Sequence, residues 1–294
     1  MKYGIIDIGS TSVRFGLIED GKTIYKKLRT TKLGTGLTRT GNLQEDTQKD
    51  SIEALSAFVA LSEAEAVDHL YAFATAAVRG AKNGADFVKK VYDACGLQIE
   101  VISGEAEAWI GLFGALQGKD GAIIDIGGAS TEISVCKSGR SVYSKSVPLG
   151  AVKLFDMAGN GNSEESRNAL LRIITEYIAD YGAVPIEGLP VYAIGGTATT
   201  LAAGYLRLAE YDPKKVDGLA ISRREVCAFT EILLKKTPKE RMREYRIPDT
   251  RADIIGGGCL LLCNILQKYG IPRIIISESD NIEGFYLLKT GGLR

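Results

Sequence analysis

The string Ile-Ile-Asp-Ile-Gly stands at residues 5–9 and again, letter for letter, at residues 123–127. In both places an apolar run leads into an aspartate, a turn rich in serine and threonine follows, and a second strand-like run comes next. Self-similarity of this kind indicates a repeated structural unit. Two unrelated buried strands could share five letters by chance, but the flanking turns also align. The repeat therefore predicts a duplicated domain, in which each copy opens with the same strand and turn.

The length of the chain agrees with two such units, because single hydrophobic cores rarely grow beyond about 250–300 residues. The chain has 294 residues, a formal net charge of zero and a pI near 6.6. No overall field therefore favours a nucleic acid or an anionic membrane as a partner, although a local phosphate pocket stays open. The first residues run straight into a strand, and no apolar run reaches the length of a membrane-spanning helix. We therefore expect a cytoplasmic protein.

The five cysteines show no paired C-x-x-C spacing and stand among apolar residues. An odd number of cysteines in a chain without secretory features is typical of a reducing compartment. We therefore expect all five to be reduced core thiols: Cys95, Cys136, Cys227, Cys259 and Cys263.

Strand-like and helix-like segments alternate along both halves of the chain. Three strand-like runs fill residues 3–34, and three more fill residues 122–148. Helix-spaced apolar residues predict helices over 44–66, 87–95, 105–117, 163–181, 198–208, 222–236, 251–269 and 282–289. Short apolar runs predict further strands over 70–75, 98–102, 191–194 and 273–277. Such alternation indicates an α/β protein whose sheets are covered by helices.

Two segments look like anion-binding motifs, and we interpret both as ordinary structure. Residues 16–23 match the letters of a P-loop, but that motif acts only between a strand and a helix. Here Asp20 and Gly21 predict a hairpin turn between two strands. Residues 235–246 are rich in lysine and arginine, but two glutamates are interleaved with them. That pattern favours a solvated helix face over a track for a polyanion.

The aspartates of the two repeats, Asp7 and Asp125, each directly follow a buried apolar run. A carboxylate in such a place costs free energy unless a cation or hydrogen-bond donors face it. Two carboxylates at equivalent positions of a duplicated fold would face one another across a cleft, where a Mg²⁺-bound phosphate chain could lie. The turns after them offer backbone amides and hydroxyls to an anion. Residues 195–197, Gly-Gly-Thr at a strand end, offer a third contact of this kind.

Seven segments together resemble the exopolyphosphatase/guanosine pentaphosphate phosphatase family, within the superfamily of actin, sugar kinases and heat-shock chaperone ATPases. These segments are residues 6–14, 74–79, 100–108, 124–132, 148–152, 194–200 and 251–255. The resemblance covers essentially the whole chain. It implies an α/β fold of two ribonuclease-H-like (actin-like ATPase) domains with an active cleft between them. By this resemblance, residues 1–119 with 279–294 form the first domain, and residues 120–278 form the second.

The resemblance also implies roles for individual residues. Glu107 would be the catalytic glutamate that orients the attacking water, and Arg79 would grip the terminal phosphate. The structural alternative for Glu107 is a charge at a helix start that complements the dipole, and the alternative for Arg79 is a surface arginine. Mg²⁺ would be held by Asp7 and Asp125, and by Glu132 through water. The expected phosphate contacts are Ser10, Thr11, Ser12, Arg14, Gly127, Gly128, Ser130, Thr131, Gly196 and Thr197, although strand alternation could equally place Arg14 in solvent.

The implied activity is Mg²⁺-dependent release of terminal phosphate from inorganic polyphosphate or guanosine pentaphosphate. A small-molecule kinase on the same fold is one alternative, and a non-catalytic nucleotide- or alarmone-binding regulator is another. Five positions depart from the family pattern and leave the substrate and its chain length open: Thr11, Ala106, Trp109, Ala129 and Ile282. Ala129 replaces a glycine, so its backbone must avoid positive φ or accept strain. The family also suggests a homodimer.

Overall fold

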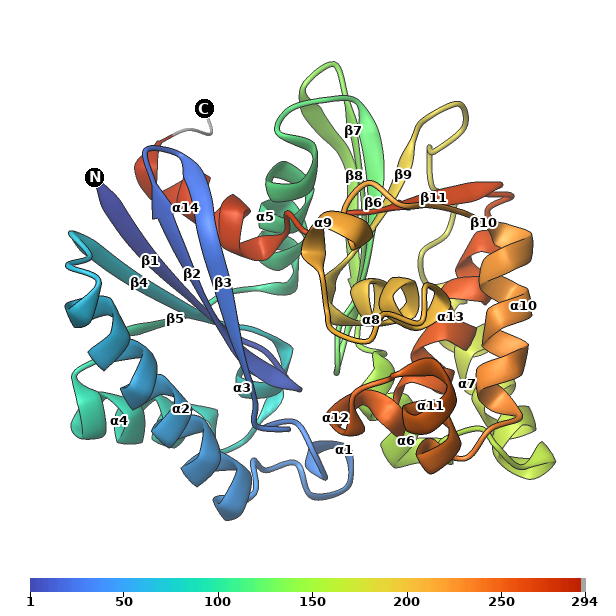
Figure 1. Ribbon diagram of the computed structural model, residues 1–294, viewed down its shortest axis with the longest axis horizontal. Coiled ribbons are helices and arrows are strands. Elements are labelled where there is room, and N and C mark those ends of the chain that lie inside the picture. Colours follow the sequence, from blue (N-terminus) through green and yellow to red (C-terminus); the bar gives the residue numbers. More distant parts are fainter. Residues whose placement is uncertain (292–294) are drawn as a thin grey trace.

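The chain forms two β-sheets, each flanked by helices (Figure 1). A cavity lies between the two sheets. The computed structural model describes residues 1–291. The first sheet contains five strands in the order β3-β2-β1-β4-β5, and the second contains six in the order β10-β11-β9-β6-β7-β8. This arrangement confirms the α/β class that the alternating segments predict.

The two sheets share one plan. In the first sheet, an antiparallel meander is formed by β1 (Lys2–Ile8), β2 (Ser12–Glu19) and β3 (Lys22–Thr30), and β4 (His69–Ala74) and β5 (Ile99–Val101) extend it in parallel. In the second sheet, the meander is formed by β6 (Gly121–Ile126), β7 (Thr131–Lys137) and β8 (Arg140–Val147). It is extended in parallel by β9 (Val191–Ile194) and β11 (Arg273–Ile276), and β10 (Ala220–Ser222) forms the edge. The predicted triple of strands is therefore present in both halves.

Helices pack on both sheets (Figure 1). The first half contains α1 (Leu37–Thr40), α2 (Glu45–Ala64), α3 (Ala76–Gly80), α4 (Gly84–Cys95) and α5 (Gly104–Leu116). The second half contains α6 (Ala151–Ala158), α7 (Glu164–Ala179), α8 (Gly195–Tyr205), α9 (Pro213–Val216), α10 (Arg223–Leu234), α11 (Pro238–Tyr245), α12 (Asp249–Ala252) and α13 (Ile255–Lys268). The chain then returns to the first sheet as α14 (Asn281–Thr290).

Helix α5 lies between the two sheets because it is apolar on two faces. Leu112 and Leu116 pack against the second sheet, whereas Ile110 packs against the first sheet and α14. α5 and α14 cross so closely that a β-carbon on Gly284 would lie 1.7 Å from the carbonyl oxygen of Ile110. Since α14 packs against β1, we propose that residues 1–119 with 279–294 form the first domain and 120–278 the second. Residues 292–294 of that range lie outside the described part of the chain.

Most predicted elements are present, and the differences are local. Asp20 and Gly21 have φ of 48° and 78° and join β2 to β3, so the hairpin interpretation is confirmed and the P-loop letters precede no helix. The single helix predicted over 251–269 is two helices, α12 and α13, which are separated at Asp253 and Ile254. The eight-residue helix α6 was not predicted, because so short a segment shows little periodicity.

The basic segment 235–246 contains one residue that contradicts the solvated-face interpretation. Arg241 is fully buried. Its guanidinium donates hydrogen bonds to the carbonyl oxygens of Leu233 at 2.8 Å, Ala252 at 2.7 Å and Asn160 at 2.9 Å. Arg243, two residues later, is exposed as predicted. The interpretation was wrong for Arg241, because the carbonyl groups that receive it come from segments that only the fold brings together.

The prediction of five reduced cysteines was also wrong. Cys227 of α10 and Cys263 of α13 form a disulfide with their α-carbons 5.4 Å apart. The two residues are neighbours only because α10 packs against α13, and their spacing in the sequence carries no signal. Cys95, Cys136 and Cys259 are free thiols, and the last two are buried. Within residues 1–291, no helix has the length and apolar character needed to cross a membrane.

Candidate active site

A cavity of about 410 Å³ lies between the two sheets, at the carboxyl ends of β1, β6 and β9. The turns that follow β1 and β6 face each other there and touch. A β-carbon on Gly128 would lie 2.6 Å from the β-carbon of Ser10 and 2.9 Å from the hydroxyl oxygen of Thr11. The duplicated turns of the sequence therefore meet at one place, as the repeat predicts.

Most of the predicted phosphate contacts line this cavity. They are Ser10, Thr11, Ser12, Arg14, Gly127, Gly128, Ser130 and Gly196. The hydroxyls of two further predicted contacts point to the backbone instead. Thr131 donates to the carbonyl oxygen of Leu149 at 2.6 Å, and Thr197 donates to that of Ile126 at 2.8 Å. The structure therefore uses these two threonines to hold the turns in shape, beside the cavity.

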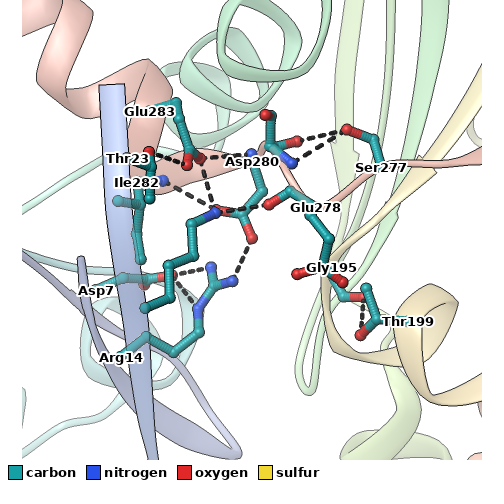
Figure 2. A network of polar contacts seen from close by, with 12 residues as sticks. Asp7, Arg14, Thr23, Gly195, Thr199, Ser277, Glu278, Asp280, Ile282 and Glu283 are labelled. Carbon is teal, nitrogen blue, oxygen red and sulfur yellow. Dashed lines mark hydrogen bonds and ion pairs between the residues drawn. The ribbon is translucent and has the colours of Figure 1, made fainter. Parts of the chain in front are cut away.

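Arg14 points into the cleft and bridges two carboxylates (Figure 2). Arg14 lies on β2 and forms an ion pair with Asp7, its cross-strand neighbour on β1. It forms a second ion pair with Asp280, the N-cap residue of α14. Lys26 lies 3.3 Å from Asp280 and 2.8 Å from Glu283. Burial opposes the ionisation of Asp280, but Arg14 and Lys26 outweigh it and hold the pKa of this carboxyl at about 2. Of the two alternatives for Arg14, the structure favours the cleft over solvent.

Asp125 occupies the place in the second sheet that Asp7 occupies in the first, but its surroundings differ. The residue opposite Asp7 in the strand register is Arg14, whereas the residue opposite Asp125 is Glu132. Within the described chain, no side chain donates a hydrogen bond to Asp125 and no cation pairs with it. The β-carbon that Gly195 lacks would lie 2.3 Å from Oδ1 of Asp125. Glycine at 195 therefore leaves room for this carboxylate.

The pKa values of the carboxyl groups around Asp125 reflect this lack of positive charge. Burial, together with the charges of Glu107 and Asp280, raises the pKa of Asp125 to about 7. Burial and the same acidic neighbourhood raise the pKa of Glu132 well above its usual range, although Ser146 donates to it at 2.5 Å. Buried carboxyl groups of this kind are stable as anions only when a cation joins them.

Glu107 and Arg79 form an ion pair at the edge of the cavity. Glu107 lies in the first turn of α5, whose N-cap is Ser103, and Arg79 lies in α3, directly after β4. Nη1 of Arg79 is 3.1 Å from Oε2 of Glu107 and 2.8 Å from the carbonyl oxygen of Ile102. Burial raises the pKa of Glu107 to about 7, although Arg79 acts in the opposite direction. A carboxyl group near neutrality, held in place by an arginine, is suited to accept a proton from water.

The side chains fit a Mg²⁺ ion that is coordinated largely by the phosphates of a bound substrate and by water. Among the described residues, no three histidine, cysteine or carboxylate side chains converge as a ready-made metal cluster. Mg²⁺ needs no such cluster, because it retains waters and binds through one or two carboxylates together with substrate phosphates. Asp125 and Glu132 are hard oxygen donors that lack a cationic partner, which fits the ion. Asp7 is already neutralised by Arg14 and fits less directly.

Three of the five positions that depart from the family pattern, Ala129, Ile282 and Trp109, fit their surroundings, whereas the hydroxyl of Thr11 is buried without a hydrogen-bond partner among the described residues. Ala129 is absent from the residues with positive φ, so its backbone needs no glycine. Ile282 is fully buried and packs on Gly16, where a β-carbon would lie 2.5 Å from its Cγ2 atom. Trp109 packs against Phe113 with ring centroids 4.7 Å apart and the ring planes tilted by 52°.

Sequence reasoning missed several residues of the cavity, among them Lys26, Arg251 and Asp280. Arg251 approaches Gly196 so closely that a β-carbon there would lie 2.6 Å from the guanidinium. No carboxylate of the described chain pairs with Arg251, and burial lowers its pKa to about 10, so it stays cationic at neutral pH. The segment 251–255 belongs to the quoted motifs and could have indicated this residue. No comparable signal marks Lys26 or Asp280.

Comparisons with known proteins agree with the fold. A family model described as the Ppx/GppA phosphatase family matches residues 17–289. Exopolyphosphatase 2 of Mycobacterium tuberculosis is 26% identical over 99% of both chains. A bifunctional 3-dehydroquinate synthase/phosphatase of Fusobacterium nucleatum is 27% identical over 96% of this chain, which spans only 46% of that protein. The crystal structure of an Aquifex aeolicus Ppx/GppA family member is 29% identical, with a TM-score of 0.81 over 99% of this chain and 98% of that one.

Proposed function

The chain belongs to the Ppx/GppA phosphatase family, and from that premise we propose a Mg²⁺-dependent phosphohydrolase that releases terminal phosphate from inorganic polyphosphate or guanosine pentaphosphate. One observation carries the proposal: the partly buried Arg79–Glu107 pair at 3.1 Å. In this pair Arg79 would be the cation for a phosphoryl group, and Glu107 would be the base for water. The two turns and the unpaired carboxylate of Asp125 lie in the adjoining cavity.

The residues of the first half would act on the terminal phosphate. Nη1 of Arg79 contacts Glu107 and the carbonyl oxygen of Ile102, so the remaining N–H groups of its planar fork would bind two phosphate oxygens. Glu107, with a pKa of about 7, would then orient a water in line with the phosphorus and take its proton. Positioning and charge stabilisation supply most of the catalysis of phosphoryl transfer, so no covalent residue is required.

The residues of the second half would hold the phosphate chain. Gly127 and Gly128 line the cavity. The amide of Gly127 donates to the carbonyl oxygen of Ser130 at 3.0 Å and holds the turn, so the amide of Gly128 and the unpaired guanidinium of Arg251 would contact the phosphates. Asp125 would hold Mg²⁺ directly and Glu132 through water. When bound, the ion would neutralise charge on the phosphate oxygens.

The two alternatives make different use of the same cleft. A kinase would need an acceptor other than water beside Glu107, and no described residue identifies one. A non-catalytic regulator is suggested by Ala129 and Ile282, but neither residue obstructs Arg79 or Glu107. Hydrolysis is therefore the function that we propose. The cytoplasmic location and the homodimer stay predictions.

The test is an assay of the purified protein with Mg²⁺ and either polyphosphate or guanosine pentaphosphate. Release of inorganic phosphate is expected, and Glu107→Gln should reduce it by about 10²- to 10⁴-fold. Glu53→Gln, which changes an exposed carboxylate of α2, is the matched control and should keep full activity. Full activity of Glu107→Gln would refute the mechanism. Transfer of phosphate to another acceptor would indicate a kinase, and tight binding without turnover would indicate a regulator.

A further inference from the structure

Asn281, the first residue of α14, has a side-chain amide that no residue of the described chain satisfies. The residue is only 5% exposed. Its Oδ1 atom is buried without a hydrogen-bond partner. The NH2 group of the same amide forms no hydrogen bond within the described chain either. Buried polar groups in folded proteins nearly always have a partner, and an amide without one costs stability. The amide of Asn281 therefore needs a partner from outside the chain.

One end of this amide lies against a wall of small and apolar groups. A β-carbon on Gly111 of α5 would lie 2.7 Å from Oδ1 of Asn281, 3.2 Å from Cδ1 of Ile123 and 3.4 Å from Cδ1 of Ile194. None of these three neighbours has a side chain that can form a hydrogen bond. Asn281 also lines the cavity between the two sheets. Because the oxygen end is closed in, the NH2 end is the one that a water in the cavity can reach.

The same wall places Asn281 near two carboxylates of the candidate active site. Gly111 follows Glu107 by one turn of α5, so the two residues share a face of the helix. Ile123 precedes Asp125 by two residues on β6, so their side chains lie on the same face of the sheet. The amide of Asn281 therefore lies about one helical turn from Glu107 and one side-chain repeat of the strand from Asp125.

The close crossing of α5 and α14 fixes the position of Asn281. A β-carbon on Gly114 of α5 would lie 2.0 Å from the carbonyl oxygen of Asp280, and one on Gly284 of α14 would lie 1.7 Å from that of Ile110. The glycines thus let the two helices touch at Asp280 and at Gly284, on either side of Asn281. A residue that orients other groups requires such a rigid support.

We propose that Asn281 is a positioning residue: its NH2 group holds one buried water, which donates hydrogen bonds to the carboxylates of Glu107 and Asp125. This inference rests on the proposed function, in which Glu107 is the base. A buried water typically has about three such partners. The held water is distinct from the water that attacks phosphorus. It gives Asp125 the hydrogen bond that no side chain of the described chain supplies, and it keeps Glu107 in the orientation that accepts a proton.

The test is Asn281→Leu, because leucine has the same branched shape as asparagine and no polar atom. The kcat for phosphate release should fall about 10- to 100-fold. KM should stay within about twofold of the wild-type value, because the groups that bind phosphate are unchanged. The melting temperature should not fall, since leucine suits the apolar wall. Asn168→Leu, on the exposed face of α7, is the matched control and should change neither kcat nor KM.

An unchanged kcat in Asn281→Leu would overturn the positioning role. A lower kcat that comes with a lower melting temperature would also overturn it, because Asn281 would then only support the fold. Asn281→Ser keeps a donor and leaves space for a second water, so its kcat should lie above that of Asn281→Leu. A serine variant as slow as the leucine variant would show that the donor is not what matters.

A crystal structure of the wild-type protein separates this inference from the proposed hydrolysis. If the wild type releases no phosphate from polyphosphate or guanosine pentaphosphate, the proposed hydrolysis fails. The water is still expected within hydrogen-bond distance of Nδ2 of Asn281 and of the carboxylates of Glu107 and Asp125. Its presence there supports the inference. Its absence, at a resolution that shows other buried waters, overturns the inference whatever the activity.

Discussion

Asp125 and Glu132 lie directly opposite each other on β6 and β7, two carboxylates at the position where the first sheet pairs Asp7 with Arg14. Like charges opposite one another in a sheet are destabilising. The two copies of the duplicated unit therefore share one backbone arrangement but differ in the charge of one side chain, Arg14 in the first copy and Glu132 in the second. In the first sheet, Arg14 neutralises Asp7. In the second sheet, no cation of the described chain pairs with Asp125 or Glu132, so both are stable as anions only when a cation from outside the chain binds.

We expect Asp125→Asn to stabilise the metal-free protein at neutral pH. The pKa of Asp125 is raised from 3.8 to about 7, so its contribution to stability is present below pH 4 and is lost as the pH rises through 7. Removing the charge should recover at most about 4 kcal/mol. Thermal unfolding at pH 8 measures the gain. Mg²⁺ should raise the melting temperature of the wild type and have less effect on the variant; an equal Mg²⁺ effect would contradict the assignment.

The pH dependence of phosphate release should follow Glu107. This residue must be ionised to accept a proton, and its pKa is about 7, so kcat/KM should fall as the pH is lowered below 7. A steady-state pH profile between pH 5 and 9 measures it. The terminal phosphate of the substrate also titrates near this range, so the profile is repeated on Arg79→Lys. The loss of the forked partner should move the enzyme's limb to higher pH, whereas a limb that comes from the substrate would stay in place.

Arg79→Lys should lower kcat/KM by about 10²- to 10³-fold. Lysine keeps the charge but cannot contact Glu107, the carbonyl group of Ile102 and a phosphate with one planar fork. Arg140→Lys, at the exposed start of β8, is the matched control and should have no effect. Near-normal turnover in Arg79→Lys would show that a point charge suffices.

Gly195→Ala should cost more stability than Gly188→Ala. Both glycines have positive φ, 77° and 75°, so alanine strains either backbone by about 1–2 kcal/mol. Open space surrounds Gly188, whereas a β-carbon at 195 would lie 2.3 Å from Asp125. The difference between the two free energies of unfolding isolates this clash, and we expect roughly 1–3 kcal/mol. Equal losses would mean that Asp125 moves aside freely.

Arg241→Ala should destabilise the second half by about 3–5 kcal/mol, because it leaves buried carbonyl groups without donors and opens a cavity. Arg243→Ala, in the same helix but exposed, should change the free energy of unfolding by less than about 0.5 kcal/mol. Chemical denaturation of the two variants measures the contrast. A small loss for Arg241→Ala would show that water enters and replaces the guanidinium.

The duplication could be predicted from the sequence because few folds place identical strings at equivalent positions. Asp7, Asp125, the turns and the triple of strands in each half followed from it. Arg14 and Arg241 show where such reading fails. The period of a strand or helix says which face a side chain takes. However, one of the two partners of Arg14 is the distant Asp280, and the partners of Arg241 are carbonyl groups from three segments. Contacts between residues so far apart leave no local pattern.

The sequence alone determined the α/β class, the duplication, the two aspartates, and Glu107 and Arg79 as candidates, because these depend on local periodicity and recurring motifs. Only the tertiary structure decided which carboxylates are neutralised. Charge balance is a property of the assembled cleft: Arg14 reaches Asp7 and Asp280 because α14 returns to the first sheet, and Asp125 stays unpaired because Glu132 lies opposite it. The disulfide between α10 and α13 was decided in the same way, by helix packing.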